Sequence, residues 1–419
     1  MPPPDPANAS PGAASLSPAD SQRRIAILLL IVFVDLLGFG VLIPLIPFYA
    51  VRLGLPAEAV TLVIALHSLM QFVGAPILGR LSDRHGRRPV LAISMAGHAL
   101  AYALLIMSDS LLLLIVSRLL SGVTSANLAA AYAYITDVTP PARRAASLAK
   151  LSASFALGFA LGPAIGGLLA GGATVEQADL VRPAIAAALF SMLALLGIVL
   201  FLPESHRPQH TAAGASTRRP PPASRRQLLS DRALALMVTL ALLVLAFAAM
   251  RESLLSLWLH ARLAFDAHTI GLVFTVNGFM IAIVQFTITG RLATRFGEMV
   301  TLRIGVACYG LSWLGLVLAP GLQLVLVAIA INAVGTALFG TSLQTLVSLR
   351  SPAAVRGAVM GLYQSSSSLA RFLGAAFSGT LFGQLGPNVP FAIGAAAMLP
   401  AMAITFAIAA RLKQPAEGQ

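Results

Sequence analysis

Long apolar runs recur along this chain of 419 residues, and they restrict its fold more than any other feature. About 20 apolar residues in a helix cross the hydrocarbon core of a bilayer. The mean hydropathy of +0.86 lies far above that of a water-soluble domain. Twelve runs are of about this length, at 25–50, 58–79, 90–108, 110–136, 146–171, 181–202, 233–258, 268–290, 299–319, 321–348, 357–384 and 389–410. We therefore predict an all-α integral membrane protein with twelve transmembrane helices.

A polar segment rich in proline and arginine divides these helices into two sets of six. We predict a disordered N-terminal tail over 1–22, an N-terminal six-helix bundle over 23–202, a cytoplasmic linker over 203–232, a C-terminal bundle over 233–411 and a C-terminal tail over 412–419. The segment GRLSDRHGR from Gly79 returns as GRLATRFGE from Gly290, at the equivalent place in the second set. This duplication predicts two pseudo-symmetric halves.

The net charge of +13 follows from membrane orientation. Cytoplasmic loops collect Lys and Arg, and most of the 28 in this chain lie in such loops if both termini are cytoplasmic. We therefore expect no nucleic-acid partner. Neither Lys150 nor Lys413 follows a glycine-rich run, which excludes a P-loop and makes direct nucleotide-driven pumping unexpected. No cluster with catalytic or metal-ligand spacing is evident, so we expect neither an enzyme nor a bound metal or cofactor.

The stretch GRLSDRHGRRPVL concentrates charge between two apolar runs. Gly79 would let another helix approach closely, and Gly86 allows a tight reversal with positive φ. Asp83 can cap a helix N-terminus. The arginines Arg84, Arg87 and Arg88 can pair with carboxylates or with anionic membrane lipid. The alternative interpretation is that these arginines only obey the positive-inside rule.

This stretch resembles the signature loop between helices two and three of the major facilitator superfamily. The resemblance implies the major facilitator fold. It also implies a charge latch in which Asp83 and Arg87 engage Asp137 and the start of helix eleven, closing the inner face. In the second copy Thr294 replaces Asp83 and Glu298 replaces Arg87, so a second latch of this type is not expected.

A second motif, GFALGPAIGG, lies in helix five. Glycines at every fourth position make a smooth face for close packing, and the proline bends the helix and frees a carbonyl. The motif is similar to a signature of the superfamily's exporters, carried here by Gly158, Gly162, Pro163, Gly166 and Gly167. The alternative is generic packing of small residues.

RLLSGVTSAN from Arg118 and DLLGFGVLIPLIPFY from Asp35 also resemble twelve-helix drug:proton antiporters, including tetracycline exporters. Those exporters carry an aspartate before the tyrosine of helix three, where this chain has Ala101 before Tyr102. Their acid in helix nine has no counterpart in 299–319. The general exporter assignment survives these departures, but tetracycline itself becomes a less expected substrate.

Ionisable residues inside the membrane are costly and are functional candidates by default. Counting along the helices places Asp35, His67, His98 and Arg118 at one level near the bilayer midplane. We predict that Asp35 is the proton site and that Arg118 modulates it. A static pair of Asp35 with Arg118 or with a histidine, stabilising the bundle, remains the alternative.

Polar residues of the second half are candidates for the substrate cavity. Glu252 is placed in the outer third of helix seven, where it would gate, bind a cation or pair with Arg251, and only one of these neighbours is expected to face the cavity squarely. The full set of possible cavity or substrate residues is His67, His98, Glu252, Asn277, Gln285, Asn332, Gln344 and Arg371.

Together these features predict a monomeric, multi-pass protein of the bacterial inner (plasma) membrane with both termini cytoplasmic. Its expected function is proton-coupled efflux of a lipophilic drug-like compound or metabolite, with cations among the candidates, by alternating access of the two halves. Its partners would be the small-molecule substrate, protons and membrane lipid. Proton-coupled uptake or facilitated transport of a small metabolite is the main alternative, and a transporter-like sensor is a minor one.

Overall fold

The computed structural model describes residues 18–107, 110–140, 143–171, 178–205, 231–351 and 356–412, and every regular element in these ranges is a helix. The first half consists of α1 (Pro18–Leu42), α2 (Ile46–Arg52), α3 (Ala57–His85), α4 (Arg87–Ile106), α5 (Leu111–Thr124), the 3₁₀ turn η2 (Ser125–Asn127), α6 (Leu128–Val138), α7 (Arg144–Ala170) and α8 (Val181–Phe201). The second consists of α10 (Arg232–Leu263), α11 (Ala267–Val284), the π-helical segment η4 (Gln285–Thr289), α12 (Gly290–Phe296), α13 (Glu298–Leu318), α14 (Leu322–Arg350), α15 (Arg356–Leu385) and α16 (Val389–Leu412).

The predicted twelve-helix architecture is confirmed. Eleven stretches of the described chain are long and apolar enough to cross a membrane, and α1 with α2, α5 with α6, and α11 with α12 each count as one of them. The twelfth is α15, whose run of four serines from Ser365 and whose Arg371 lower its hydropathy. It packs along α3 and α10 within the bundle, so its polar residues face protein and not lipid.

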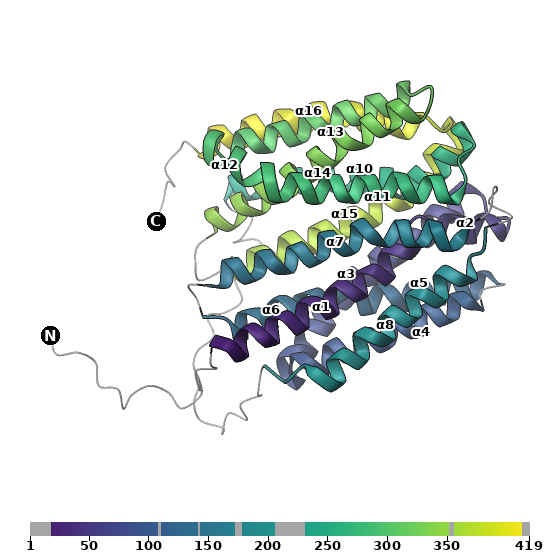
Figure 1. Ribbon diagram of the computed structural model, residues 1–419. Helices are drawn as coiled ribbons and strands as arrows, with labels where there is room; N and C mark the ends of the chain where they lie inside the picture. The colour runs from purple at the N-terminus through teal and green to yellow at the C-terminus, as the bar shows by residue number, and fades with distance from the viewer. Residues whose placement is uncertain are drawn as a thin grey trace, which may run out of the picture.

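The helices run side by side, with α1 starting and α16 ending at the same end of the molecule (Figure 1). We call this the terminal end and the opposite one the distal end. The hydrophobic cores differ between the two ends. One core joins residues of both halves, among them Leu45, Phe48, Leu254 and Trp258. Three further cores each belong to a single half, one to the first and two to the second.

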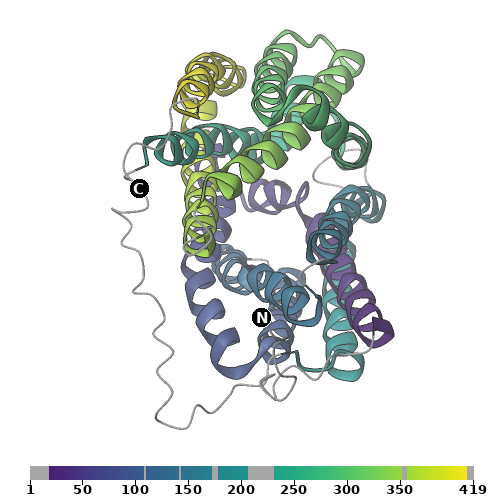
Figure 2. The ribbon, with the colours of Figure 1, turned by 90° about the vertical axis from the view of Figure 1, so that its left-hand side faces the viewer.

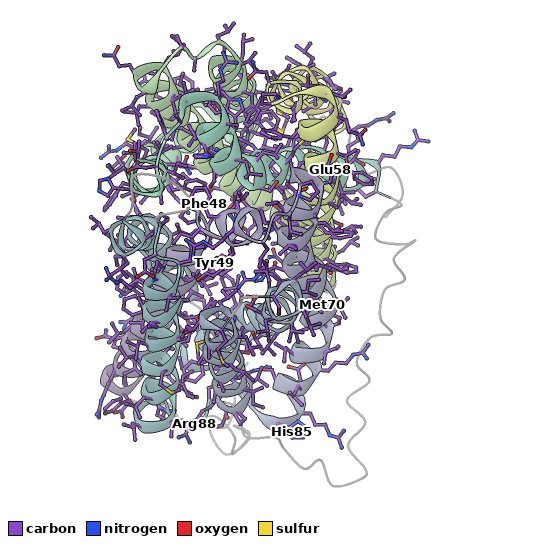
Figure 3. All side chains as sticks on the ribbon, turned by 90° about the vertical axis from the view of Figure 1, so that its right-hand side faces the viewer. Phe48, Tyr49, Glu58, Met70, His85 and Arg88 are labelled. Carbon is purple, nitrogen blue, oxygen red and sulfur yellow. The ribbon has the colours of Figure 1, made fainter. Side chains whose placement is uncertain are left out.

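The halves are thus joined at the distal end and keep separate cores towards the terminal end. Viewed from the terminal end, helices of both halves surround the axis between them (Figure 2). At the distal end Phe48, Tyr49 and Glu58 of the first half lie beside the second half (Figure 3). The rings of Phe48 and His260 meet edge to face with centroids 6.3 Å apart, and a Cβ on Gly379 of α15 would lie 2.7 Å from the Glu58 Cα.

The helices follow the predicted runs, but α3, α10 and α12 end five or six residues later than predicted, and η2 interrupts the fourth run. Two further differences concern the first run. The first run breaks after Leu42, because Pro44 and Pro47 each lack the N–H that a continuous helix requires, and it resumes as α2. At its start, α1 begins at Pro18, so the last five residues of the predicted 1–22 tail are helical. The remainder of that tail, most of the 203–232 linker and residues 413–419 lie outside the described residues.

Candidate functional site

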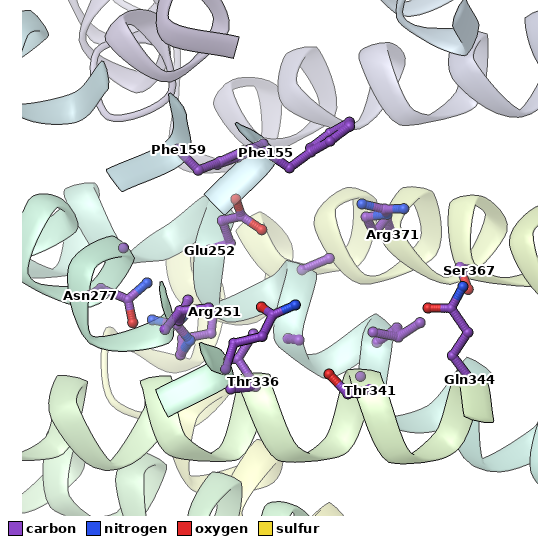
Figure 4. A pocket seen from close by; sticks show the side chains of 18 of the residues that line it. Phe155, Phe159, Arg251, Glu252, Asn277, Thr336, Thr341, Gln344, Ser367 and Arg371 are labelled. Carbon is purple, nitrogen blue, oxygen red and sulfur yellow. The ribbon is translucent and has the colours of Figure 1, made fainter. Parts of the chain in front are cut away.

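A cavity of about 480 Å³ lies between the two halves, of the size that binds drug-like molecules. Its walls differ in chemistry. The first half supplies Ile43, Leu128, Tyr132, Phe155, Phe159 and Pro163. The second half supplies most of the polar groups: Arg251, Glu252, Asn277, Gln285, Tyr309, Thr336, Thr341, Gln344, Gln364, Ser367 and Arg371 (Figure 4). The cavity therefore has one apolar, aromatic wall and one polar, charged wall.

Hydrogen bonds between helices fix the polar wall. The Asn332 Nδ2 of α14 donates to Asn277 Oδ1 of α11 at 3.2 Å, and the Tyr309 hydroxyl of α13 donates to Thr336 Oγ1 at 3.2 Å. Asn332 is fully buried and is not a lining residue, so it positions Asn277 instead of facing the cavity. The sequence did not identify Tyr309 or Thr336, because a single polar residue in a helix does not reveal whether its side of the helix faces the cavity.

Three ionised side chains line this cavity: Arg251, Glu252 and Arg371. The expectation that only one of the neighbours Arg251 and Glu252 faces the cavity is wrong. The cavity reaches around α10, so that in Figure 4 Glu252 lies towards Phe159 while Arg251 lies towards Asn277 and Thr336. Glu252 borders the central cavity, and α10 continues beyond it to Leu263.

The ionisable residues of the first half form a separate buried cluster. Asp35 of α1 and His98 of α4 are 7% and 3% exposed, and Asp35 Oδ1 lies 2.8 Å from His98 Nδ1. The other ring nitrogen, His98 Nε2, lies 3.1 Å from Ser125 Oγ in the 3₁₀ turn η2. The break between α5 and α6 thus places a hydroxyl where the histidine can bond it.

The cluster continues from η2 to α3. Ser125 Oγ donates to the Ser121 carbonyl at 2.7 Å, and Ser121 Oγ lies 3.1 Å from His67 Nδ1. Two of the four residues predicted at one level, Asp35 and His98, are therefore paired directly, and His67 joins them through α5. Neither histidine is among the cavity-lining residues. The serines were missed because isolated serines are common in membrane helices.

Arg118 lies beside this cluster without an ion pair among the described residues. It is 4% exposed, and its Nη2 donates to Ser117 Oγ at 3.2 Å. Its carbonyl accepts from Ser121 Oγ at 3.2 Å. Asp35 is therefore paired with His98, and Arg118 contributes a buried positive charge to the same region of the first half.

The residues of the predicted latch gather at the terminal end of the first half. Arg87 donates to Asp83 Oδ1 at 2.6 Å and to Asp137 Oδ2 at 3.3 Å, which links the α3–α4 turn to the end of α6. Arg88 donates to the carbonyls of Ile198 and Val199 at the end of α8. Arg84 is exposed, and Gly86 turns the chain with φ of 101°.

Two features of the latch differ from expectation. Glu204, not Asp83, caps α4, since its carboxylate accepts from the backbone N–H of Arg87 at 2.9 Å and of Arg88 at 3.1 Å. A Cβ added to Gly79 would meet no atom of the described residues within 4 Å, so no helix approaches it closely here. The physical reason is that the two halves have separate cores towards this end. Residues 352–355, just before α15, lie outside the described residues.

The glycine motif of α7 packs in two directions. Gly158, Gly162 and Gly166 face α1: a Cβ on Gly162 would lie 2.6 Å from the Gly40 Cα. A Cβ on Gly167 would lie 3.1 Å from the Gly271 Cα of α11 in the other half. Pro163 itself lines the cavity. The motif thus joins the helix that carries Asp35 to the interface between the halves.

Comparison with known proteins places this architecture in a family. A sequence model of the Major Facilitator Superfamily matches residues 28–261 and 242–419. The chain belongs to the major facilitator superfamily. It is a multi-pass membrane transporter of this type. A class G tetracycline resistance protein from Vibrio anguillarum is 34% identical over 83% of this chain and 88% of its own length. Major facilitator superfamily domain-containing protein 10 of Mus musculus is 29% identical, covering 96% of this chain and 95% of its own.

Solved structures show the same fold. The human organic anion transporter MFSD10 superposes with a TM-score of 0.70 at 23% identity, over 92% of this chain and 99% of that one. The nucleoside transporter NupG superposes with a TM-score of 0.73 at 15% identity, over 94% and 100%. In the described part of this chain, no three His, Cys, Asp or Glu side chains gather closely enough to hold a metal ion.

Proposed function

We propose that this transporter exports a lipophilic, drug-like compound in exchange for protons, by alternating access of its two halves. The observation that carries the proposal is the buried Asp35–His98 pair, 2.8 Å apart inside the first half. Ionisable groups at this depth are costly and serve proton relays in many transporters. The similarity to tetracycline resistance proteins over most of the chain supports export as the direction.

The hydrogen bonds around His98 support a proposal for how many protons the pair holds. Ser125 donates its hydroxyl hydrogen to the Ser121 carbonyl, so Ser125 Oγ accepts from His98 Nε2, which must then carry a hydrogen. One further proton lies between His98 Nδ1 and Asp35. The pair is either aspartic acid with neutral histidine or aspartate with histidinium, and both forms hold the transported proton.

Release of that proton requires only a local rearrangement. With Asp35 ionised and hydrogen retained on Nδ1 alone, Nε2 becomes an acceptor, and the Ser125 hydroxyl rotates from the Ser121 carbonyl towards it. Because Ser121 Oγ contacts His67, the change is transmitted from α1 and α4 to α3. The Asp35–His98 pair is thus the proton-binding unit of the proposal, and Arg118, buried in the same half, is proposed to modulate it.

Aromatic contacts connect this cluster with the cavity. The Phe39 ring lies 5.3 Å from the His67 ring and 5.6 Å from the Phe159 ring, centroid to centroid, and Phe159 lines the cavity. A change in the position of α3 therefore moves the apolar wall that would hold the compound. Each chain contains both halves and a complete pathway, so the proposal requires no second copy.

The orientation follows from the arginine-rich terminal end, which we place in the cytoplasm. In this arrangement the structure is closed at the outer, distal end. The latch of Asp83, Arg87 and Asp137 is proposed to engage the second half when the inner side closes. Its separation from α15 at Gly79 agrees with the open inner side.

The test is transport by the purified protein in liposomes with an imposed pH gradient. Tetracycline, ethidium, rhodamine 6G and fluorescein would be offered separately, and wild-type protein is expected to move at least one of them against its gradient. Asp35→Asn keeps the shape of the side chain but holds no transported proton, so gradient-driven transport should fall to the level of protein-free liposomes. Downhill exchange of the compound should persist.

Asp179→Asn is the matched control, because Asp179 caps α8 and pairs with Arg182 outside the proton cluster. It should transport as wild type does. Gradient-driven transport by Asp35→Asn equal to that of wild type would refute the proton site. Transport by wild type that is indifferent to the pH gradient would refute proton coupling altogether.

A further inference from the structure

We propose that the transported compound is an amphipathic organic anion, whose acidic end lies at the cavity wall that carries Arg251 and Arg371 and whose apolar part lies against Phe155 and Phe159. This inference deepens the proposed function by naming the substrate class, and it rests on the central cavity being the substrate site. It departs from the expectation that cations are among the substrates. The charges and contacts of the cavity wall carry it.

Arg251 is the first observation. Its side chain lines the cavity and the residue is 7% exposed, yet its Nε and Nη1 have no hydrogen-bond partner among the described residues. A guanidinium at this depth is not explained by the positive-inside rule, which concerns loops. Buried charges are kept in membrane proteins when they bind something, and a guanidinium binds carboxylate, sulfonate and phosphate groups through two parallel N–H donors.

Arg371 is the second observation. It lines the same cavity from α15, and its Nε likewise lacks a partner in the described part of the chain. Two guanidinium groups on one cavity wall repel each other unless negative charge lies between them. Arg303 of α13 also has an unpartnered Nε, but it does not line the cavity and its guanidinium lies over the Phe406 ring at 4.0 Å. The two cavity arginines have no such aromatic partner among the described contacts.

Glu252 is the one lining carboxylate among the described residues. It forms no ion pair with either arginine in the described ranges, and it lies on the side of Phe159, whereas Arg251 lies towards Asn277 and Thr336 (Figure 4). The wall therefore keeps a net positive charge. A cationic substrate bound at Glu252 would bring its charge close to two unneutralised arginines, which disfavours it.

The apolar wall on the opposite side of the cavity indicates the nature of the rest of the transported compound. Phe155 and Phe159 come from α7, with Tyr132 beside them from α6, and together they offer apolar and aromatic surface without an ionised group. A flat apolar body lies well against such rings. A cavity of about 480 Å³ accommodates a compound of drug size. The division of the walls thus selects a molecule with one apolar and one acidic end.

The experiment compares two dyes that share a tricyclic xanthene core and carry opposite charge, fluorescein and rhodamine 6G. Binding to purified protein in nanodiscs of uncharged lipid would be followed by fluorescence anisotropy at pH 8, without a pH gradient. We expect fluorescein to bind at least about tenfold more tightly than rhodamine 6G. Arg251→Gln and Arg371→Gln should each weaken fluorescein binding by about tenfold or more and leave rhodamine 6G unaffected or tighter.

Two further variants keep the test decisive. Arg251→Lys preserves the charge and shows whether loss of binding by Arg251→Gln reflects charge or misfolding, and Arg303→Gln is the matched control for removing an arginine elsewhere. Glu252→Gln should bind fluorescein as well as or better than wild type. Tighter binding of rhodamine 6G by wild type, loss of dye binding on Glu252→Gln, or unchanged fluorescein binding by both arginine variants would each overturn the proposal. Because no gradient is applied, these outcomes are independent of proton coupling.

Discussion

Gly166→Ala tests the close packing of α7 on α1, and its effect can be estimated from the structure. A Cβ at Gly166 would lie 2.1 Å from the Val41 carbonyl oxygen, whereas ordinary contact begins at 3.4 Å. The obstacle is backbone, so one helix must move away by more than 1 Å. Overpacking of this kind costs about 1–3 kcal/mol, and the better helix propensity of alanine offsets about 1 kcal/mol.

The expected net loss is therefore up to about 2 kcal/mol of unfolding free energy, a decrease in Tm of at most about 2–3 °C for a chain of 419 residues. The displacement also reaches the proton cluster. Asp35 lies six residues before Val41, about 9 Å along α1, and its 2.8 Å contact with His98 would not survive a shift of 1 Å. Gradient-driven transport should fall together with stability.

Thermal unfolding of purified protein in detergent, followed by circular dichroism, gives the first measurement, and liposome transport gives the second. Gly361→Ala is the matched control, since a Cβ at Gly361 in α15 meets nothing among the described residues within 4 Å. It should leave Tm unchanged or slightly raised. A Gly166→Ala variant as stable and as active as Gly361→Ala would refute the reasoning.

Three smaller predictions concern caps and turns, and each is measured by thermal unfolding. Glu204→Ala removes the acceptor for two N–H groups of α4 and should cost about 1 kcal/mol, and an unchanged Tm would contradict this capping role. Gly86→Ala places a Cβ at φ of 101°, 2.5 Å from the Glu204 carboxylate, and should cost about 2 kcal/mol; a neutral result would contradict the turn. Burial raises the pKa of Asp266, but its hydrogen bonds from Thr269 lower the pKa by more. The pKa of Asp266 therefore lies below the ordinary value of an aspartate. Asp266→Ala should therefore destabilise at neutral pH, by about 1 kcal/mol, and the difference from wild type should disappear as acid protonates the carboxylate.

The sequence predicted the number and bounds of the helices well, because hydropathy and arginine placement are local properties. It also predicted that Asp35 and His98 share a level, since depth follows from counting along a helix. It could not show that they touch while Arg118 does not pair with Asp35, because helix rotation is set by packing. The sequence predicted the smooth helix face of Gly158, Gly162 and Gly166, but not that α1 packs against this face.

The cavity was the least predictable part. Arg251 and Glu252 are adjacent, and a helical wheel alone gives them different faces, yet the cavity reaches both. The capping role of Glu204 was hidden because it acts on a helix more than a hundred positions earlier in the chain. Such long-range contacts depend on the tertiary arrangement and carry no local sequence signal.

The unequal distribution of the hydrophobic cores determines what a conformational change would cost. Opening the cavity towards the distal end would mean separating the apolar cluster around Trp258 and Phe48, and the energy for this must come from surfaces that meet at the terminal end. Replacing a side chain in that cluster by a smaller one should thus change the fraction of molecules in each conformation, although the side chain contacts no bound compound. A molecule bound at the terminal end, between the separate cores of the two halves, would stop the transport cycle. That opening is therefore a place to look for inhibitors.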